Sequence, residues 1–464
     1  MSDTSNLLLT FFGDDNTGST DSMEALALAG VSTVLFLDPP TPRDLAHFPG
    51  VQAVGVAGMT RALPPDEMES VLEPAFRALR ALGAPLCHYK VCSTFDSAPH
   101  VGSIGRAIDV GMRVFQAERV PLLVGAPALR RYTLFGTHFA TVGQETFRLD
   151  RHPTMSRHPV TPMNEADLRR HLRAQSTKSV ASFDILALEG SWQEVQERFD
   201  AWQAGERADV VLFDVLDDAR LATAGQLIWR EAHRGNAFVV GSSGVEYALV
   251  LALRQAGLVP ETPRERTSLG KERQVLVVSG SCSPVTQAQI DRALAEGSGF
   301  EGLDVGAASL LDRANSEAAR ELAVRGALAI LERGASPLLY SARGPEDERI
   351  GRAEAVWRAS HGGGGGPGRA LGEQLGLIVR AVLERWNAHS RRLRRVIVAG
   401  GDTSGHGARR LGVEALTIVG PTAPGSPLCR AHASDPLIDG LDLLFKGGQV
   451  GRTDFFEAVR DGAF

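Results

Sequence analysis

The chain has 464 residues, which predicts two or three domains, and its 43% hydrophobic and 22% charged residues are typical of a globular protein. Its 49 basic and 55 acidic residues give a net charge of −6, which argues against general attraction to nucleic acid or anionic membranes. The sequence contains no secretory signal, no membrane-length apolar stretch and no metal-type cysteine spacing, so we predict a cytoplasmic protein with small-molecule partners, no nucleic acid and no membrane.

Short apolar runs alternate with helix-like segments through the first half of the chain. The first run, 7–12, is followed by the polar sequence GDDNTGSTD and by a helical segment at 21–29. Further β-rich runs are expected at 31–37, 51–57, 86–91, 120–124, 208–215 and 237–240. One amphipathic helix is expected at 66–82. This alternation predicts a mostly parallel sheet flanked by helices.

The sequence LVPETPRERTSLGKER is the best candidate for a linker, because it is rich in Pro and charged residues and poor in apolar anchors. It divides the chain into an amino-terminal domain, 1–258, a linker, 259–273, and a carboxyl-terminal domain, 274–464. The β-rich run 275–278 then restarts the strand and helix alternation. The predicted fold class is α/β with two domains, each holding a mostly parallel sheet flanked by helices.

Two segments of the second half combine a β-branched run, a glycine loop and a helix start. One is RVIVAGGDTSGHG, 395–407, followed by a helix-like segment at 408–411. The other is VLVVSGSCSP, 275–284, followed by a helix-like segment at 286–295. Such loops present backbone N–H groups to an anion, and the Ser and Thr hydroxyls add donors. The pair therefore favours a nucleotide phosphate site, although tight turns also use glycine for geometry alone.

The identity of the nucleotide follows from motifs that the sequence lacks. The chain has no GxxxxGK[ST] sequence, and no GxGxxG followed by an acidic residue at the dinucleotide spacing, so ATP is favoured over a dinucleotide. Near the carboxyl terminus, FKGGQVG at 445–451 adds glycines and one cation. By itself it is typical of a simple turn. Together with the two other glycine loops, this segment is suited to close over the purine or a phosphate of a bound nucleotide.

In the first half, Asp14 and Asp15 follow the first predicted strand, where ligands bind in open α/β sheets. A carboxylate there is suited to orient a hydroxyl or to accept its proton during attack on a γ-phosphate. The alternative is that Asp15 or Thr17 caps the next helix. Capping explains one of the two carboxylates but not the pair.

Cationic and hydroxyl side chains also follow other predicted strands. Lys90 is suited to pair with a substrate carboxylate, and Ser93 to bond to a hydroxyl. Arg61 and Arg131 carry guanidinium groups that bind carboxylates in a bidentate manner. For each cation considered alone, a solvated surface position is the commoner alternative.

These motifs together resemble the four-carbon acid sugar kinase family. The resemblance covers nearly the whole chain in the order of the family, with the segments GDDNTGSTD (13–21), GSSG (241–244), VVSGSCSPVTQAQI (277–290), AGGDTSG (399–405), PGSPL (424–428) and KGGQVG (446–451). It implies an amino-terminal acid-sugar domain and a carboxyl-terminal ATP domain, with phosphoryl transfer in the interdomain cleft.

The resemblance also implies roles for single residues. Substrate contacts are implied at Asp14, Asp15, Thr17, Arg61, Lys90 and Ser93. Nucleotide contacts are implied at Ser279, Ser281, Gly400, Gly401, Asp402, Thr403, Ser404, Gly405 and Gly447.

The chain departs from the pattern of the family in its first half. Where typical members have a Lys-x-Asp-Ser-Thr-Leu-Arg-Gly type motif, this chain reads KVCSTFDS, with Cys92 in place of the aspartate and no arginine following. The segment after Pro127 is shortened and leaves Arg131 as the counterpart of the family's arginine. Both departures concern the substrate rather than ATP.

We therefore predict an ATP- and Mg²⁺-dependent kinase that phosphorylates a hydroxyl of a small sugar acid, with Asp15 as the catalytic residue. The departures favour 3-oxo-isoapionate or a related 3-oxo acid over threonate, erythronate or 3-oxo-tetronate. A nucleotide-regulated sugar-acid binding protein without chemistry and a dehydrogenase are the alternatives. Metal ligands and the oligomeric state, for which a homodimer is one option, are left open.

Overall fold

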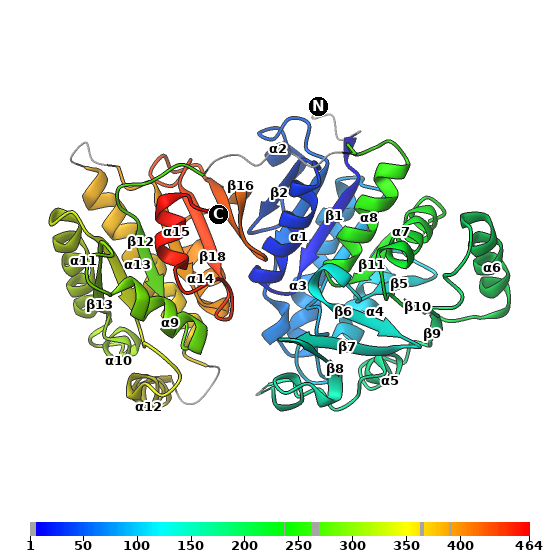
Figure 1. Ribbon diagram of the computed structural model, residues 1–464, viewed down its shortest axis with the longest axis horizontal. Helices are drawn as coiled ribbons and strands as arrows, with labels where there is room; N and C mark the ends of the chain where they lie inside the picture. The colour runs from blue at the N-terminus through cyan, green and yellow to red at the C-terminus, as the bar shows by residue number, and fades with distance from the viewer. Residues whose placement is uncertain (1–5, 159, 236, 262–268, 362–365, 389–391) are drawn as a thin grey trace. The chain divides into compact units, whose positions relative to one another are not determined.

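The computed structural model describes residues 6–158, 160–235, 237–261, 269–361, 366–388 and 392–464 (Figure 1). The chain divides into two compact units, Met1–Arg264 and Glu265–Phe464, and each has a mostly parallel sheet flanked by helices. The predicted fold class is thereby confirmed. The division falls within the predicted linker, 259–273. Because residues 262–268 lie outside the described part of the chain, the linker itself stays a prediction.

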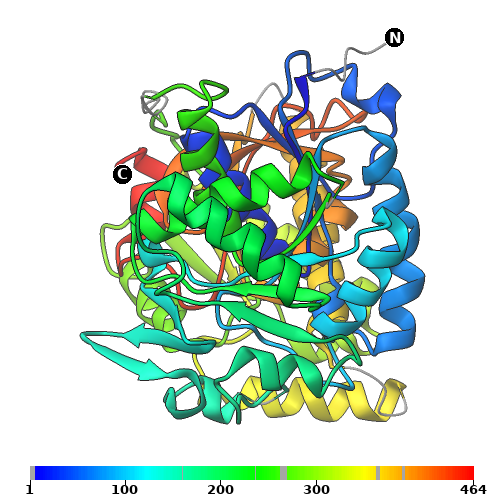
Figure 2. The ribbon, with the colours of Figure 1, turned by 90° about the vertical axis from the view of Figure 1, so that its right-hand side faces the viewer.

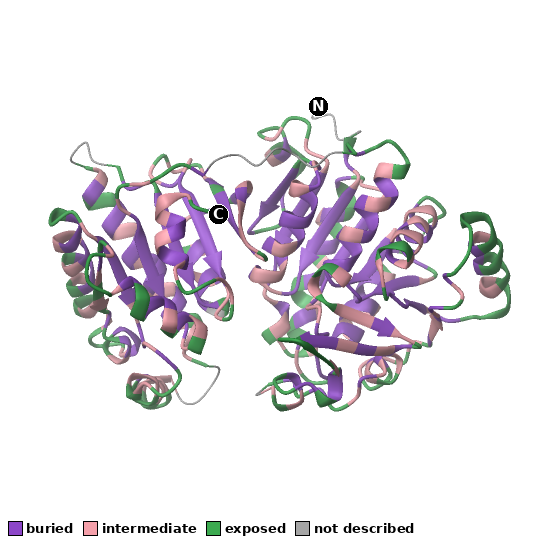
Figure 3. Cartoon of the chain, in the orientation of Figure 1, coloured by how far each residue is buried: buried purple, intermediate pink, exposed green. Residues whose placement is uncertain are grey.

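The amino-terminal unit is built on a parallel sheet with the strand order β2-β3-β1-β4-β11-β5-β10-β9. The strands are β1 (Leu9–Gly13), β2 (Thr33–Phe36), β3 (Ala53–Ala57), β4 (Leu86–Lys90), β5 (Val120–Leu123), β9 (Val180–Phe183), β10 (Val210–Phe213) and β11 (Phe238–Gly241). Every residue of the central strands β1, β3 and β4 is buried (Figure 3). Burial on both faces explains why these strands appear in the sequence as continuous apolar runs.

Helices cover both faces of this sheet. Helices α1 (Asn16–Leu28), α7 (Asp218–Ala232) and α8 (Gly244–Gln255) pack on one face, and α3 (Pro65–Ala81) and α4 (Ile104–Phe115) on the other (Figures 1 and 2). None of the helices in the described part of the chain has the length and apolar character to cross a membrane.

The register of the sheet brings the predicted site residues together. Gly13, the last residue of β1, pairs with Ala57 of β3 and with Lys90 of β4, and Lys90 also pairs with Gly241 of β11. The residues that follow these strands therefore meet at one edge of the sheet, which is where an open α/β sheet binds ligands.

A second, antiparallel sheet belongs to the same unit and is not predicted by the sequence analysis. It consists of β6 (Arg131–Leu134), β7 (Thr137–Val142) and β8 (Glu145–Arg148), which follow one another as hairpins. Figure 2 shows this small sheet outside the main sheet of the unit. It carries Arg131, one of the predicted substrate-binding residues.

The carboxyl-terminal unit has the strand order β13-β14-β12-β15-β18-β17-β16. The first five strands are parallel to their neighbours, and β17 runs antiparallel to both β18 and β16. The strands are β12 (Leu276–Ser279), β13 (Phe300–Asp304), β14 (Ser336–Tyr340), β15 (Arg395–Ala399), β16 (Ala415–Ala423), β17 (Ser426–His432) and β18 (Asp442–Lys446). Because Ala399 pairs with both Ser279 and Lys446, the ends of β12, β15 and β18 lie side by side.

The predicted glycine loop at 400–407 is wrong in its extent, because helix α14 (Gly401–Leu411) begins directly after Gly400. Helix α14 packs closely against α13 (Gly368–Asn387). A Cβ atom on Gly376 would lie 2.5 Å from the carbonyl oxygen of Gly407, and one on Gly372 would lie 2.9 Å from Cα of Thr403. Close approach of the two helix backbones therefore accounts for Gly372 and Gly376 of α13.

Candidate active site

The turn between β1 and α1 holds a three-residue ion-pair cluster. Asp15 caps α1, with Oδ1 accepting a hydrogen bond from the Gly18 N–H at 2.7 Å. Its Oδ2 lies 2.7 Å from Nη1 of Arg61. Arg61 also binds Asp14 in a bidentate manner, through Nε at 3.0 Å and Nη2 at 2.7 Å. Asp15 therefore caps the helix and also faces the cluster, while its side chain keeps 31% of its surface exposed.

Burial shapes the electrostatics of this cluster. Asp14 is only 2% exposed, and burial raises the pKa of its carboxyl group, with Arg61 opposing that effect. Burial lowers the pKa of the Arg61 guanidinium, whereas the two neighbouring carboxylates raise it. The carboxylates have the larger combined effect, so the pKa of Arg61 lies well above its usual value. All three nitrogens of Arg61 that carry hydrogens are used inside the protein, so Arg61 orients Asp14 and Asp15.

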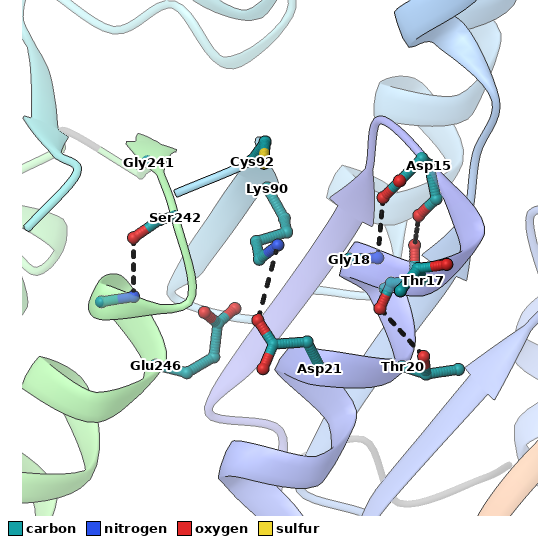
Figure 4. Close-up of polar contacts among 12 residues, drawn as sticks. Asp15, Thr17, Gly18, Thr20, Asp21, Lys90, Cys92, Gly241, Ser242 and Glu246 are labelled. Atoms are coloured by element: carbon teal, nitrogen blue, oxygen red, sulfur yellow. Dashed lines mark hydrogen bonds and ion pairs between the residues drawn. The ribbon is translucent and has the colours of Figure 1, made fainter. Parts of the chain in front are cut away.

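Lys90 lies beneath the first turn of α1 (Figure 4). Its side chain is buried, and Nζ lies 3.8 Å from Oδ2 of Asp21. Burial raises the pKa of the Asp21 carboxyl group, and the charge of Lys90 opposes this rise. A Cβ on Gly18 would lie 2.8 Å from Nζ of Lys90 and 2.5 Å from Oδ1 of Asp15, so a side chain there would displace these two groups. Thr17 lies half-buried in the same turn.

A buried His–Glu pair supports the neighbouring strand ends. His88 Nδ1 lies 2.6 Å from Oε1 of Glu246, and His88 Nε2 donates to the Gly241 carbonyl at 3.1 Å. The other carboxyl oxygen of Glu246 is buried and has no hydrogen-bond partner among the described residues. In Figure 4 Glu246 points toward Asp21 and Lys90. Sequence reasoning missed this pair, although a histidine within the buried run LCHYK was its signal.

The GSSG sequence fixes the turn from β11 into α8. The Ser242 hydroxyl donates to the Val124 carbonyl at 2.7 Å and accepts from the Gly244 N–H at 3.0 Å. A Cβ on Gly241 would lie 1.9 Å from the carbonyl oxygen of Leu123. This motif therefore holds two neighbouring strands together and positions Glu246.

The segment after β4 contains the residues that depart from the family pattern. The Cys92 thiol lies 3.0 Å from the Thr94 hydroxyl, which donates to Oδ1 of Asp96 at 2.7 Å. Burial and the nearby Asp96 raise the pKa of Cys92 to about 11, so this residue stays a thiol at neutral pH. The backbone carbonyl of Ser93 accepts a hydrogen bond from Nε2 of His138 at 2.9 Å.

In the carboxyl-terminal unit, three strand ends meet through small residues. The Gly280 N–H donates to the Ala399 carbonyl at 2.9 Å, and the Gly400 N–H to the Lys446 carbonyl at 2.8 Å. A Cβ on Gly280 would lie 2.4 Å from Cγ2 of Thr403, and one on Gly448 would lie 3.0 Å from Oγ of Ser281. The predicted residues Ser281, Gly400, Thr403 and Gly447 are thus brought together.

A buried lysine, not among the predicted site residues, lies under these loops. Lys446 is 0% exposed and donates from Nζ to the Thr286 hydroxyl at 3.0 Å and to the Gly447 carbonyl at 2.9 Å. Burial lowers the pKa of this ammonium group to about 8. Thr286 in turn donates to the Gly448 carbonyl at 2.9 Å. The Lys446 ammonium group and the Thr286 hydroxyl therefore hold the backbone of the loop 446–448 in place through its carbonyl groups.

The start of α14 presents backbone donors. Gly400 has φ +133°, a conformation that glycine tolerates, and a Cβ on Gly401 would meet no atom within 4 Å. The hydroxyl groups of Thr403 and Ser404 both donate to the Gly400 carbonyl. The Ser279 hydroxyl is buried and has no hydrogen-bond partner in the described part of the chain. Gly405 is buried in the helix, and the side chain of Asp402 lies outside the described part of the structure.

Within the described ranges, no group of three or more His, Cys, Asp or Glu side chains is arranged to hold a metal ion. A magnesium ion bound through nucleotide phosphates needs only one or two protein carboxylates.

The two units match two known domain families. Residues 9–249 match the family described as the sugar-binding N-terminal domain, and residues 276–456 match the nucleotide-binding C-terminal domain. Together they define the class of this protein, in which a sugar-binding domain is followed by a nucleotide-binding domain.

Similar proteins narrow this class. The chain is 47% identical to a 3-oxo-isoapionate kinase of Paraburkholderia graminis, over 98% of this chain and 94% of that protein. It is 31% identical to a 3-oxo-tetronate kinase of Cupriavidus necator, over 98% of this chain and 96% of that protein. The chain therefore belongs to the four-carbon acid sugar kinase family, as predicted.

A solved structure supports the fold alone. A Salmonella typhimurium protein described as a putative tRNA synthase superposes with a TM-score of 0.75 at 24% identity, covering 99% of this chain and 100% of that one. At this identity, the description of that protein carries no functional argument.

Proposed function

We propose that this protein transfers the γ-phosphoryl group of ATP to a hydroxyl of 3-oxo-isoapionate or a closely related 3-oxo acid. The observation that carries the proposal is the 47% identity to a 3-oxo-isoapionate kinase, against 31% to a 3-oxo-tetronate kinase, each over 98% of the chain. Threonate, erythronate and 3-oxo-tetronate are the alternative substrates. The protein is proposed to act in the cytoplasm, and a homodimer remains a prediction.

In this proposal the amino-terminal unit binds the acid and Asp15 acts on its hydroxyl. Asp15 is suited to this role because one carboxylate oxygen caps α1 while the other faces Arg61, so its position is fixed. A fixed carboxylate orients a hydroxyl for in-line attack and accepts its proton as the bond forms. The other proposed substrate contacts are Asp14, Thr17, Arg61, Lys90, Ser93 and Arg131.

The carboxyl-terminal unit is proposed to bind ATP mainly through backbone N–H groups. The open space at Gly401 and the start of an eleven-residue helix favour an anion there. When bound, Mg²⁺ would offset the negative charge of the phosphate groups. The proposed nucleotide contacts are Ser279, Ser281, Gly400, Gly401, Asp402, Thr403, Ser404, Gly405 and Gly447.

Acid-dependent ADP release tests the proposal. We expect turnover with 3-oxo-isoapionate to exceed turnover with 3-oxo-tetronate and threonate. The substitution Asp15→Asn should reduce kcat by about 100-fold or more, because it removes the proton acceptor. Asparagine keeps a good helix cap, so folding and ATP binding should be unchanged. Equal turnover of the Asp15→Asn variant would contradict the role of Asp15.

The same assay separates catalysis from binding alone. A nucleotide-regulated binding protein would bind the acid and ATP without acid-dependent ADP release. Turnover of threonate far above 3-oxo-isoapionate would overturn the substrate proposal and leave the kinase proposal intact.

A further inference from the structure

His152 is held in one orientation by the backbone that follows it. Its Nδ1 atom accepts hydrogen bonds from the N–H groups of Thr154 at 3.2 Å and Met155 at 3.1 Å. The Phe147 ring lies edge-on against the imidazole, with ring centroids 6.2 Å apart. Because Nδ1 is an acceptor, the hydrogen of the neutral imidazole is on Nε2.

The Nε2–H group of His152 has no hydrogen-bond partner among the residues that the structure describes. The residue is 5% exposed, and Nε2 is buried without a hydrogen bond. A buried donor normally finds an acceptor, so an unpartnered one indicates a ligand or a bound water. Burial and the charge of Arg131 lower the pKa of His152, which keeps it a neutral donor at neutral pH.

Arg131 offers a further donor on the face of the small sheet that carries Phe147, because Arg131 pairs with Ala140 and Ala140 pairs with Phe147. Its Nη1 atom donates to the carbonyl groups of Leu129, Arg130 and Thr141 at 2.9, 3.2 and 3.3 Å, which fixes the guanidinium plane. Its Nε atom is buried and makes no hydrogen bond within the described ranges. The Nε edge of the guanidinium is therefore free to bind an oxyanion.

Asp96 belongs to the segment that this face of the small sheet contacts, because His138, two residues before Ala140 on β7, donates to the Ser93 carbonyl. Asp96 is 8% exposed, and its charge opposes the lowering of the pKa of both Arg131 and His152. Its only hydrogen bond among the described residues is the one that its Oδ1 accepts from Thr94 at 2.7 Å. No ion pair of Asp96 occurs in the described part of the chain. A buried carboxylate without a cation is suited to accept a hydrogen bond from a hydroxyl.

We propose that Arg131 and His152 bind the carboxylate of the sugar acid, and that Asp96 accepts a hydrogen bond from the hydroxyl on the adjacent carbon. This inference rests on the proposed function. The Arg131 guanidinium offsets the charge of the substrate carboxylate, and the His152 imidazole donates a hydrogen bond to it. The substrate hydroxyl lies between the substrate carboxylate and the Asp96 carboxylate. His152 is assigned as a new substrate-binding residue, and the subsite selects 2-hydroxy acids.

Two substitutions separate substrate binding from local structure. His152→Asn keeps an acceptor near the position of Nδ1 but removes the Nε2 donor. His152→Gln places an amide near Nε2 but removes the acceptor that holds the following backbone. His158→Asn is the matched control, because Nδ1 of His158 similarly accepts from the Thr161 N–H at 3.0 Å and from the Thr161 hydroxyl at 2.9 Å.

Calorimetric titration with 3-oxo-isoapionate and with threonate measures the effect independently of turnover. His152→Asn should raise the Kd of both acids about tenfold, the loss of one hydrogen bond to a charged group, with the Kd of ATP unchanged. His152→Gln should keep the acid Kd within about twofold and lower Tm. The preference of the wild-type protein for threonate over uncharged threonamide should shrink in His152→Asn. His158→Asn should change none of these values.

Other outcomes overturn the inference or the proposed function separately. Wild-type acid affinity in His152→Asn, or a loss only in His152→Gln, would assign His152 a purely structural role. No acid binding by the wild-type protein would also overturn the subsite. Tight acid binding that His152→Asn weakens, without any acid-dependent ADP release, would leave the subsite standing and overturn the kinase proposal.

Discussion

The two units of this protein build their candidate sites from different materials. The amino-terminal site consists of charged side chains that already pair with one another, such as Arg61 with Asp14 and Asp15. The carboxyl-terminal site consists of backbone groups and hydroxyls shaped by glycines, with the single buried cation Lys446 close to them among the described residues.

This difference indicates how such a protein changes its substrate. Side-chain sites can exchange residues without changing the strands beneath them, and the departures at Cys92 and Asp96 lie there. A backbone site is tied to the fold, because its donors move only if the strands and helices move. The nucleotide motifs are accordingly intact while the acid motifs vary.

The largest expected effect comes from breaking the paired charges. Arg61→Met leaves Asp14 buried without its counter-ion and should destabilise the amino-terminal unit by about 3 kcal/mol. Hydrogen exchange of β1 and β4 peptides would measure this, with the carboxyl-terminal unit as internal reference. Arg77→Met, which removes an exposed pair with Glu73, should cost at most about 0.5 kcal/mol. A cost below about 1 kcal/mol for Arg61→Met would contradict the comparison.

A smaller effect is expected where backbone contact shapes the carboxyl-terminal unit. Gly376→Ala places a Cβ 2.5 Å from the Gly407 carbonyl oxygen and should destabilise the packing of α13 against α14 by about 2 kcal/mol. The measurement is urea unfolding followed through exchange of α14 peptides. Gly351→Ala in α12 (Glu348–His361) is the control, because its Cβ would meet no atom within 4 Å. It should be neutral or stabilising by up to about 1 kcal/mol. Equal changes in the free energy of unfolding for Gly376→Ala and Gly351→Ala would show that close packing of α13 against α14 does not require glycine at position 376.

The smallest effect concerns the buried cation and depends on pH. The pKa of Lys446 is lowered from 10.5 to about 8, so above pH 8 the unfolded chain holds a proton that the folded protein has lost. Stability rises with pH wherever the unfolded state binds more protons. The wild-type protein should therefore gain about 1 kcal/mol relative to Lys446→Met between about pH 8 and pH 9. A constant difference in unfolding free energy across this range would show that Lys446 titrates normally.

Buried strands were the part of the fold that sequence reasoning predicted well. The apolar runs that became β1, β3, β4, β12 and β15 are continuous because both faces of the sheet are covered. The starts of α1 and α14 were placed too late, since glycine and hydroxyl residues have low helix propensity. In α1 the Ser19 and Thr20 hydroxyls bond back to the carbonyls of Asp15 and Thr17 at 2.6 and 2.9 Å, so the hydrogen-bonding groups of these side chains are satisfied within the helix.

Residues that follow a strand could be predicted as site residues, but their partners could not. Asp14 and Asp15 were visible in the sequence because they directly follow β1. Glu246 pairs with His88 across 158 positions, and Lys446 with Thr286 across 160, distances that no local pattern spans. His152 belongs to a segment beside the small sheet that the alternation of strands and helices did not predict. The partners of these residues are determined by contacts between segments far apart in the sequence, so a local sequence pattern does not predict them.

Phosphorus NMR of the reaction mixture tests the central claim most directly. With ATP, Mg²⁺ and 3-oxo-isoapionate, the γ-phosphate signal should be replaced by a phosphate monoester signal in equal amount to the ADP formed. Release of inorganic phosphate alone, or an unchanged ATP signal while both ligands are bound, would contradict phosphoryl transfer to the acid.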